Sequence, residues 1–238
     1  MYTSVSGIAL RTIAHNDRNS ILSLWTAEAG RISVSIPADK GRKAARIRAL
    51  TMPLSPVCAE VDIRPDRNIF SIRELRPIFI TPGISADPAK AITAMLLADF
   101  LEASLRDQQP DRLMTVYIID SVAAFDKMER AAALNFHILF LMRLSRFFGI
   151  EPDWSRPGTL FDLREGSFTL SAPSHGQYLD ETATAALRQL SRMNIRNLGR
   201  FRLSRQQRRE ALMQILTYYS IHHRPVLQLP SLEILRGR

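Results

Sequence analysis

The sequence predicts an α+β fold, with a five-stranded OB-fold barrel over residues 1–80 followed by a mainly α-helical domain over residues 81–238. Two patterns along the chain lead to this prediction. Apolar and polar side chains alternate in the first part with the period of two that half-buried strands show. After a stretch rich in proline at residues 77–88, apolar residues recur instead at helical spacing. A small β-hairpin insertion is expected within the helical domain.

The barrel prediction depends on short alternating segments separated by turn residues. Ile32, Val34 and Ile36 point to one face of such a segment, while Ser33 and Ser35 point to the other. Strands are expected on this basis near residues 5–14, 18–27, 30–37, 54–64 and 67–76. Five short strands with no helix between them are typical of a small closed or partly closed barrel, and a generic β-sandwich is the alternative.

The helical domain begins with a clear start signal. Asp87 can cap exposed amides, and Pro88 suits the first helical position. The apolar face of this first helix is formed by Ala94, Leu97, Ala98, Leu101 and Leu105. Two further helices are expected over residues 111–126 and 131–148, and the second of these is apolar almost all round. It is therefore predicted to form the core of the second domain.

Glycines and prolines interrupt the helices over residues 149–178. Within this segment, strands at residues 160–163 and 167–170 are expected to form the hairpin. Helices resume near Asp180. The last helix begins at Ser204, with a glutamine three residues further on, which is the pattern of a capping box.

Composition limits the class of protein. A hydrophobic content of 46% and a charged content of 23% are ordinary for a globular chain and exclude general disorder. Cys58 is the only cysteine, so an internal disulfide and a thiolate zinc site are excluded. No stretch reaches the roughly 18 apolar residues that a membrane-spanning helix needs. We therefore expect a cytoplasmic protein with no membrane partner.

The net charge of +9 is unevenly distributed. Residues 1–80 carry 12 Lys and Arg against 7 Asp and Glu, residues 81–150 carry 7 against 8, and residues 151–238 carry 13 against 8. The first excess is concentrated in a basic loop between strands, formed by Lys40, Arg42, Lys43, Arg46 and Arg48. Two basic regions around a neutral middle indicate a polyanionic partner such as nucleic acid, while a solvated surface is the alternative.

An OB barrel binds single strands with a positive groove and exposed aromatic side chains. The basic loop would supply the groove. Trp25 is the candidate for stacking on a base, and packing beneath the neighbouring domain is its alternative role.

The second basic region surrounds the start of the last helix. Arg205, Arg208 and Arg209 occupy its first turns, where the helix dipole disfavours each cation by roughly 0.3 to 1 kcal/mol. Stability alone would not select cations there, so these arginines, with Arg200 and Arg202 just before them, predict a phosphate site. Pairing with acids such as Glu181 or Glu210 is the alternative. Two further candidates for DNA binding are Arg192 and Arg196. Their alternative role is to form part of a solvated helix face.

The sequence contains no recognisable catalytic constellation. Its five histidines are scattered, and it has neither a Walker-type glycine loop nor a nucleophile elbow. We expect a protein that is not an enzyme and has no catalytic residue, metal or cofactor. A metal-dependent nuclease is a remote alternative, based on the acidic residues Asp17, Asp39, Glu60, Asp62 and Asp66.

Several short motifs together resemble a known family. The segments Gly7-Ile8-Ala9-Leu10, Asn16-Asp17-Arg18, Leu24-Trp25-Thr26 and Leu54-Ser55-Pro56 resemble the N-terminal OB domain of the bacterial recombination mediator family RecO. The segments Ala98-Asp99-Phe100-Leu101, Asn135-Phe136-His137-Ile138 and Leu203-Ser204-Arg205-Gln206 resemble its helical domain. The likeness follows nearly the whole chain in order.

The resemblance implies a function in DNA repair and recombination after DNA damage. A family member would bind single- and double-stranded DNA and anneal strands coated by single-stranded-DNA-binding protein. Together with RecR it would promote the loading of RecA, and it would be associated with the nucleoid. The alternative function is that of an OB-fold RNA- or ribosome-associated binding protein, which would share the basic loop.

The resemblance also bears on metal and partner sites. Many members carry a four-cysteine zinc module, whereas residues 149–178 contain no cysteine, so this chain resembles a zinc-free variant in which the hairpin takes that place. The helical domain of the family receives the acidic, hydrophobic C-terminal tail of single-stranded-DNA-binding protein. Residues of suitable composition for that tail are Arg143, Arg146 and Phe147.

Overall fold

The computed structural model of the chain describes residues 2–38, 47–223, 226 and 228–232. The chain forms two compact units. The first contains Met1–Lys127 together with Leu229–Arg238, and the second contains Met128–Gln228. These units are defined by compactness, and the first includes helices as well as the barrel. The predicted division into domains after residue 80 stays a prediction.

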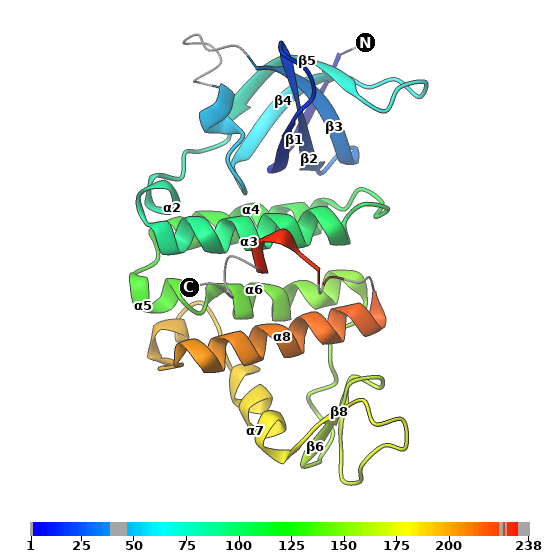
Figure 1. Cartoon of the computed structure of the whole chain (residues 1–238), viewed down its shortest axis with the longest axis vertical. Helices are drawn as coiled ribbons and strands as arrows, with labels where there is room; N and C mark the ends of the chain where they lie inside the picture. Colours follow the sequence, from blue (N-terminus) through cyan, green and yellow to red (C-terminus); the bar gives the residue numbers. More distant parts are fainter. Residues whose placement is uncertain (1, 39–46, 224–225, 227, 233–238) are drawn as a thin grey trace. The chain divides into compact units, whose positions relative to one another are not determined.

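The first unit begins with a closed barrel, as the alternating pattern predicted (Figure 1). Its strands are β1 (Tyr2–Ala14), β2 (Asn19–Thr26), β3 (Gly30–Pro37), β4 (Pro56–Asp62) and β5 (Phe70–Pro77). They follow the order β1-β2-β3-β5-β4, in which β3 pairs with β5 in parallel and the other pairs are antiparallel. The interior is filled by Val5, Ala9, Leu22, Leu24, Ile32, Val34, Ile36, Val57, Ala59 and Val61.

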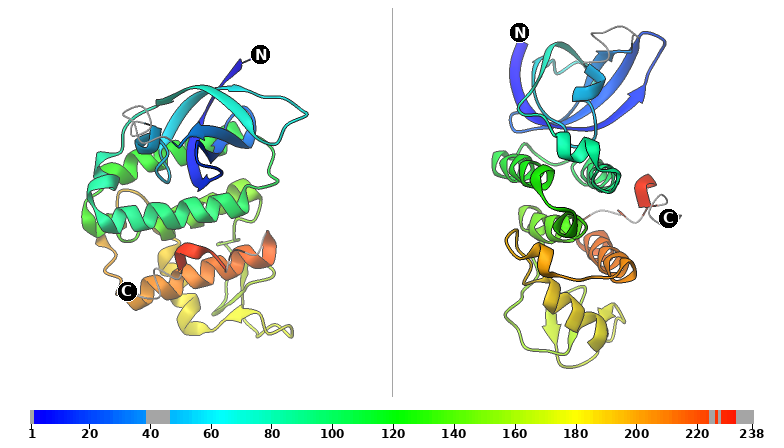
Figure 2. Two further views of the ribbon diagram at one scale, coloured as in Figure 1. Left: turned by 45° about the horizontal axis from the view of Figure 1, so that its top comes forward. Right: turned by 90° about the vertical axis from the view of Figure 1, so that its left-hand side faces the viewer.

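Three helices cover one end of the barrel within the same unit (Figure 2). They are α2 (Pro82–Ala86), α3 (Pro88–Ser104) and α4 (Arg112–Lys127). The predicted cap is confirmed, since the Asp87 carboxylate accepts a hydrogen bond of 2.8 Å from the amide of Ala89. The predicted apolar face of α3 is buried as expected. Glu102 on this helix forms an ion pair with Arg31 and accepts a hydrogen bond of 2.6 Å from Ser23, which joins α3 to the barrel.

The second unit contains α5 (Arg130–Ala133), α6 (Phe136–Leu144) and the 3-10 helix η1 (Ser145–Phe148). The prediction of one continuous helix over residues 131–148 is therefore wrong. The helix is interrupted at Leu134 and Asn135. The buried Asn135 side chain donates hydrogen bonds to the carbonyls of Leu198 and Phe201. Apolar periodicity did not reveal this break, because the partners of Asn135 are more than 60 residues away in sequence.

The predicted hairpin is confirmed and gains a third strand. The small sheet has the order β7-β6-β8, with β6 (Leu160–Asp162), β7 (Ser167–Thr169) and β8 (Tyr178–Leu179). Gly166 has a φ of 63°, a conformation that favours glycine, in the turn between β6 and β7. The remaining elements are α7 (Glu181–Leu190), the 3-10 helix η2 (Leu198–Arg200) and α8 (Arg205–His222).

Helices α6 and α8 pack side by side in the second unit (Figure 2). The buried Tyr219 hydroxyl of α8 donates a hydrogen bond of 2.8 Å to the carbonyl of Leu141 in α6. A polar group buried in this way needs such a partner. The contact joins the C-terminal half of α8 to α6.

Candidate nucleic-acid interface

The candidate interface is the arginine segment, which we define as residues 192–209. It comprises the connection from α7 to α8, including η2, and the first turn of α8 (Figure 1). Its seven arginines are Arg192, Arg196, Arg200, Arg202, Arg205, Arg208 and Arg209. All of the helical-domain arginines that are predicted to bind DNA therefore belong to this one segment.

The irregular part of the arginine segment is anchored from the α5–α6 region. The Asn135 side chain donates to the carbonyls of Leu198 and Phe201 at 3.2 and 2.9 Å. The Arg143 guanidinium donates to the carbonyl of Met193 at 3.1 Å. Met193 and Leu198 are themselves buried. Three hydrogen bonds and two buried side chains therefore hold a segment that has little regular secondary structure.

Two asparagines close a tight turn within this segment. The Asn194 side-chain oxygen accepts hydrogen bonds from the amides of Arg196 and Asn197 at 2.9 and 3.1 Å. The Asn197 side-chain oxygen accepts from the amide of Asn194 at 2.7 Å, and its side-chain nitrogen donates to the carbonyl of Arg192 at 2.9 Å. Asparagine favours such turns because its short side chain can replace backbone partners.

The start of α8 carries the predicted capping box. The Ser204 hydroxyl accepts from the amide of Gln207 at 3.1 Å, and the Gln207 side chain accepts from the amide of Ser204 at 2.8 Å. The amides of Arg205 and Gln206, in the first turn, have no acceptor within the helix. The positive end of the helix dipole and these two amides therefore lie among exposed arginines.

Six of the seven arginines are exposed and form no ion pair with any residue that the structure describes. They are Arg192, Arg196, Arg200, Arg202, Arg205 and Arg209. The alternative of pairing with Glu181 or Glu210 is not found; the Glu210 carboxylate instead accepts a hydrogen bond from Gln206. Six unneutralised guanidinium groups on one anchored segment can bind successive phosphates.

Arg208 has a different position from the other six. Its guanidinium donates to the carbonyl of Leu203, and burial lowers the pKa of this side chain. Burial, with the charge of Arg208 as a smaller cause, lowers the pKa of His137 to about 4. Arg208 therefore has a structural contact at the start of α8, and its predicted contact with DNA stays a prediction.

The predicted basic loop of the barrel lies largely outside the described residues. This applies to Lys40, Arg42, Lys43 and Arg46. Arg48 is described and exposed, in a short helical segment over residues 47–50.

Four other arginines of the first unit are paired with acids. The pairs are Arg31–Glu102, Arg64–Asp62, Arg73–Glu60 and Arg76–Glu74. The Arg64 guanidinium holds the pKa of the Asp62 carboxyl below its usual value. Arg11, Arg18 and Arg67 of the same unit are exposed and form no ion pair with a described residue, so the arginine segment differs in the density of such cations.

The stacking role of Trp25 is not supported. The side chain is fully buried, with 0% of its surface exposed, and Trp25 faces Ile8 in the pairing of β1 with β2. A base cannot reach a ring that is enclosed in this way. The alternative of packing fits its placement, and alternation along β2 missed it because both faces of this strand are covered near residue 25.

The residues predicted for a partner's acidic tail do not act as one group. Arg143 is committed to the carbonyl of Met193. The Arg146 guanidinium lies 4.8 Å from the centre of the Phe147 ring, a distance typical of a cation–π contact. Arg146 and Phe147 lie together in η1, whereas Arg143 of α6 supports the arginine segment. The tail site stays a prediction.

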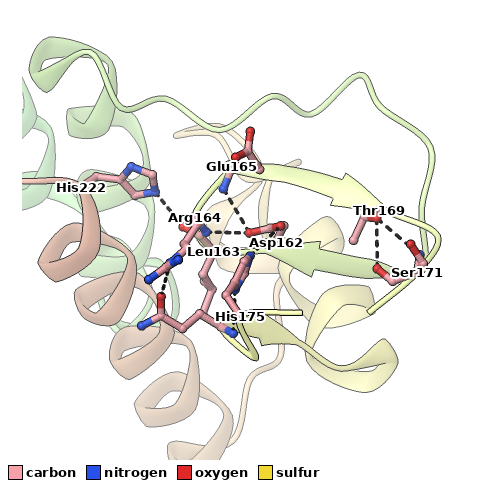
Figure 3. Close-up of polar contacts among 9 residues, drawn as sticks. Asp162, Leu163, Arg164, Glu165, Thr169, Ser171, His175 and His222 are labelled. Atoms are coloured by element: carbon pink, nitrogen blue, oxygen red, sulfur yellow. Dashed lines mark hydrogen bonds and ion pairs between the residues drawn. The ribbon is translucent and has the colours of Figure 1, made fainter. Parts of the chain in front are cut away.

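The hairpin region does not fit a zinc module. Residues 149–178 contain no cysteine, and the His175 imidazole lies 3.1 Å from the Asp162 carboxylate (Figure 3). That carboxylate also accepts hydrogen bonds from the backbone amides of Arg164 and Glu165. No group of three or more potential metal ligands occurs among the residues that the structure describes.

Aromatic packing and one arginine support the small sheet instead. The ring of Phe161 lies 5.2 Å from that of Phe168 and 6.1 Å from that of Trp154, centre to centre. Arg188 of α7 donates to the carbonyl of Gly158 and lies 3.9 Å from the centre of the Phe168 ring. The region therefore has an apolar core of its own. Small modules that lack such a core commonly depend on a bound metal for stability.

No helix in the described part of the chain is long and apolar enough to cross a membrane.

Comparison with known proteins finds related sequences along nearly the whole chain. Residues 1–80 match the family Recombination protein O N terminal, and residues 85–233 match Recombination protein O C terminal. The chain is 33% identical over 238 residues to a DNA repair protein RecO of Phocaeicola vulgatus, covering 99% of this chain and 98% of the relative. It is 33% identical to that of Bacteroides fragilis over 239 residues, and 32% identical to that of Porphyromonas gingivalis over 234 residues. These two comparisons cover 99% and 96% of this chain, and 98% and 95% of the relatives.

Proposed function

Because this chain belongs to the RecO family of DNA repair proteins, we propose that it is a recombination mediator that binds single- and double-stranded DNA through its arginine segment. In this function it anneals strands coated by single-stranded-DNA-binding protein. With RecR, it promotes the loading of RecA. The protein acts at the nucleoid and makes or breaks no covalent bond.

The observation that carries this proposal is the absence of ion pairs for six exposed arginines within residues 192–209, among the described residues. Exposed arginines without an ion pair to a described residue also occur singly elsewhere, for example Arg11, Arg18 and Arg67, whereas the arginine segment holds six of them within residues 192–209. Leaving six like charges close together costs Coulomb energy, which a polyanion would relieve. A DNA backbone supplies the necessary negative charge at regular spacing.

Annealing requires a protein that holds single strands without selecting their sequence. Guanidinium contacts to phosphates meet this requirement, since they position a strand but carry no sequence information. The basic loop, with Lys40, Arg42, Lys43, Arg46 and Arg48, provides a second set of phosphate contacts in this proposal. Arg146 and Phe147 are the proposed contact for the acidic tail of single-stranded-DNA-binding protein.

The salt dependence of binding tests the role of the arginine segment. If about five phosphates are neutralised on a single strand, log affinity falls with log salt at a slope near −3.5. Replacing Arg196, Arg205 and Arg209 by glutamine removes up to three of these contacts, and the slope should move to about −1.4. Fluorescence anisotropy of a labelled oligonucleotide between about 50 and 200 mM salt measures both values.

The matched control replaces three paired arginines, Arg73, Arg76 and Arg156, by glutamine. This triple variant loses the same net charge, but it should keep the wild-type slope. Equal loss in both triple variants would show that overall charge, and not the arginine segment, determines binding. Tighter binding to structured RNA than to single-stranded DNA, without annealing, would contradict the proposed function.

Mediator activity is tested by annealing complementary strands precoated with single-stranded-DNA-binding protein. Two forms of that protein, with and without its acidic tail, separate DNA binding from partner recognition. We expect faster annealing with the tail than without it. Equal rates would contradict the proposed tail contact, while annealing itself would still support the DNA-binding role.

A further inference from the structure

One apolar side chain lies exposed in the middle of the arginine segment. Ile195 has 55% of its surface accessible, although its neighbours Met193 and Leu198 are buried. Arg192 and Arg196 flank it in sequence, and both are exposed. A single exposed apolar side chain is common in folded proteins, but Ile195 lies between exposed cations along the chain.

The turn that carries Ile195 is held in one conformation. The reciprocal hydrogen bonds between Asn194 and Asn197 close the turn on either side of Ile195. The buried Met193, whose carbonyl accepts from Arg143, anchors the residue before the turn. A side chain on such a support is presented with little loss of conformational entropy on binding.

Leu170 is a useful comparison within the same unit. It is 76% exposed and follows the strand β7. Its neighbours Thr169 and Ser171 are uncharged and form a local turn, with the Thr169 hydroxyl 3.2 Å from the Ser171 carbonyl. Isolated exposed apolar residues of this kind are common and need no function. Ile195 differs from Leu170 in its flanking cations and in the rigid turn that carries it.

We propose that Ile195 contacts the bases of a bound single strand, and this inference rests on the proposed function. Phosphates on Arg192 and Arg196 would place the adjacent nucleotides within reach of the turn. An unstacked base has an apolar face, and an exposed isoleucine side chain can cover that face and remove apolar surface from water. The arginines therefore bind the backbone, while Ile195 favours strands whose bases are unpaired and accessible.

If the contact exists, the contribution of Ile195 to affinity depends on the presence of bases, whereas the contribution of the arginines depends on the phosphates. A single-stranded oligonucleotide and an abasic strand of equal length and charge separate these two contributions. Ile195→Ala should weaken binding of the normal strand about fivefold, the effect of losing part of the apolar burial of one side chain. Binding of the abasic strand should stay unchanged. The matched control, Leu170→Ala, should leave both affinities at the wild-type value.

A second variant gives a direct signal. In Ile195→Trp the introduced indole should stack on a base, so its emission, measured as the difference from the wild-type protein, should be quenched by the normal strand but not by the abasic strand. Both substitutions are at an exposed position, and a thermal melt that matches the wild type confirms that each variant is folded.

The outcomes separate the inference from the function on which it rests. If neither strand binds, the proposed DNA-binding function fails. If the abasic strand binds with normal salt dependence and Ile195→Ala weakens both strands equally or neither, the base contact alone is refuted. Normal binding of naked strands by Ile195→Ala, with slower annealing of coated strands, would assign the side chain to a protein partner and would also refute the contact.

Discussion

Asn135 provides the sharpest test of how the arginine segment is positioned. Its buried side chain donates hydrogen bonds to the carbonyls of Leu198 and Phe201, at 3.2 and 2.9 Å. The substitution Asn135→Ala removes both donors and leaves two carbonyls without these partners. At roughly 0.5 to 1.5 kcal/mol for each lost bond, the free energy of unfolding should fall by about 1 to 3 kcal/mol.

The loss should also appear locally. Amides within residues 198–203 should exchange hydrogen faster, because η2 loses its attachment to the α5–α6 junction. Affinity for single-stranded DNA should fall even where the variant remains folded, since the exposed arginines on either side are no longer held in one arrangement. Urea unfolding, hydrogen exchange and anisotropy measure the three effects.

The control is Asn68→Ala, which removes the same amide from an exposed position of the first unit. It should change the free energy of unfolding by less than about 0.5 kcal/mol. A change of similar size in both variants, or an Asn135→Ala protein with unaltered exchange at residues 198–203, would refute the anchoring role.

Three other predictions concern stability. Ser204→Ala should cost about 1 kcal/mol in unfolding free energy by removing half of the capping box, and a urea titration that shows no loss would contradict this. Gly166→Ala should cost about 1 to 3 kcal/mol, because a Cβ there would lie 2.5 Å from the Tyr218 hydroxyl oxygen and the φ of 63° is unfavourable; an unchanged melting temperature would disprove the clash. The pKa of His137 is about 4 in the folded protein against 6.5 ordinarily, so unfolding takes up a proton and stability should decrease as the pH falls from 6.5 towards 4. His137→Gln should show a flatter pH profile over this range, and an identical profile would show that other groups are responsible.

Much of the local structure was predictable, because it depends on residues that are close in sequence. Alternation identified the barrel strands, since one-sided burial imposes a period of two. Asp87 and Ser204 were recognised as caps, because a capping side chain binds amides two or three residues away. The turn at Gly166 followed from the same local chemistry.

The candidate site was predictable only in part. The sequence indicated the arginines of the last helix and their unfavourable position against the helix dipole, yet it did not separate Arg208 from its neighbours. Asn135, Asn194 and Asn197 were missed altogether. The two-residue step from Asn194 to Arg196 was a possible signal for an Asx turn, whereas nothing local to Asn135 reveals its distant acceptors.

By itself, the sequence determined the OB-like barrel, the helix starts, the hairpin, the uneven charge and the family resemblance. Tertiary structure decided which cations are free. Arg31 meets Glu102 only because α3 packs against the barrel, and Trp25 is buried because its strand is covered on both faces. The physical reason is that burial and ion pairing depend on distances between remote segments. Strand alternation and helix capping, by contrast, depend only on residues a few positions apart in sequence, so they can be recognised without the tertiary structure.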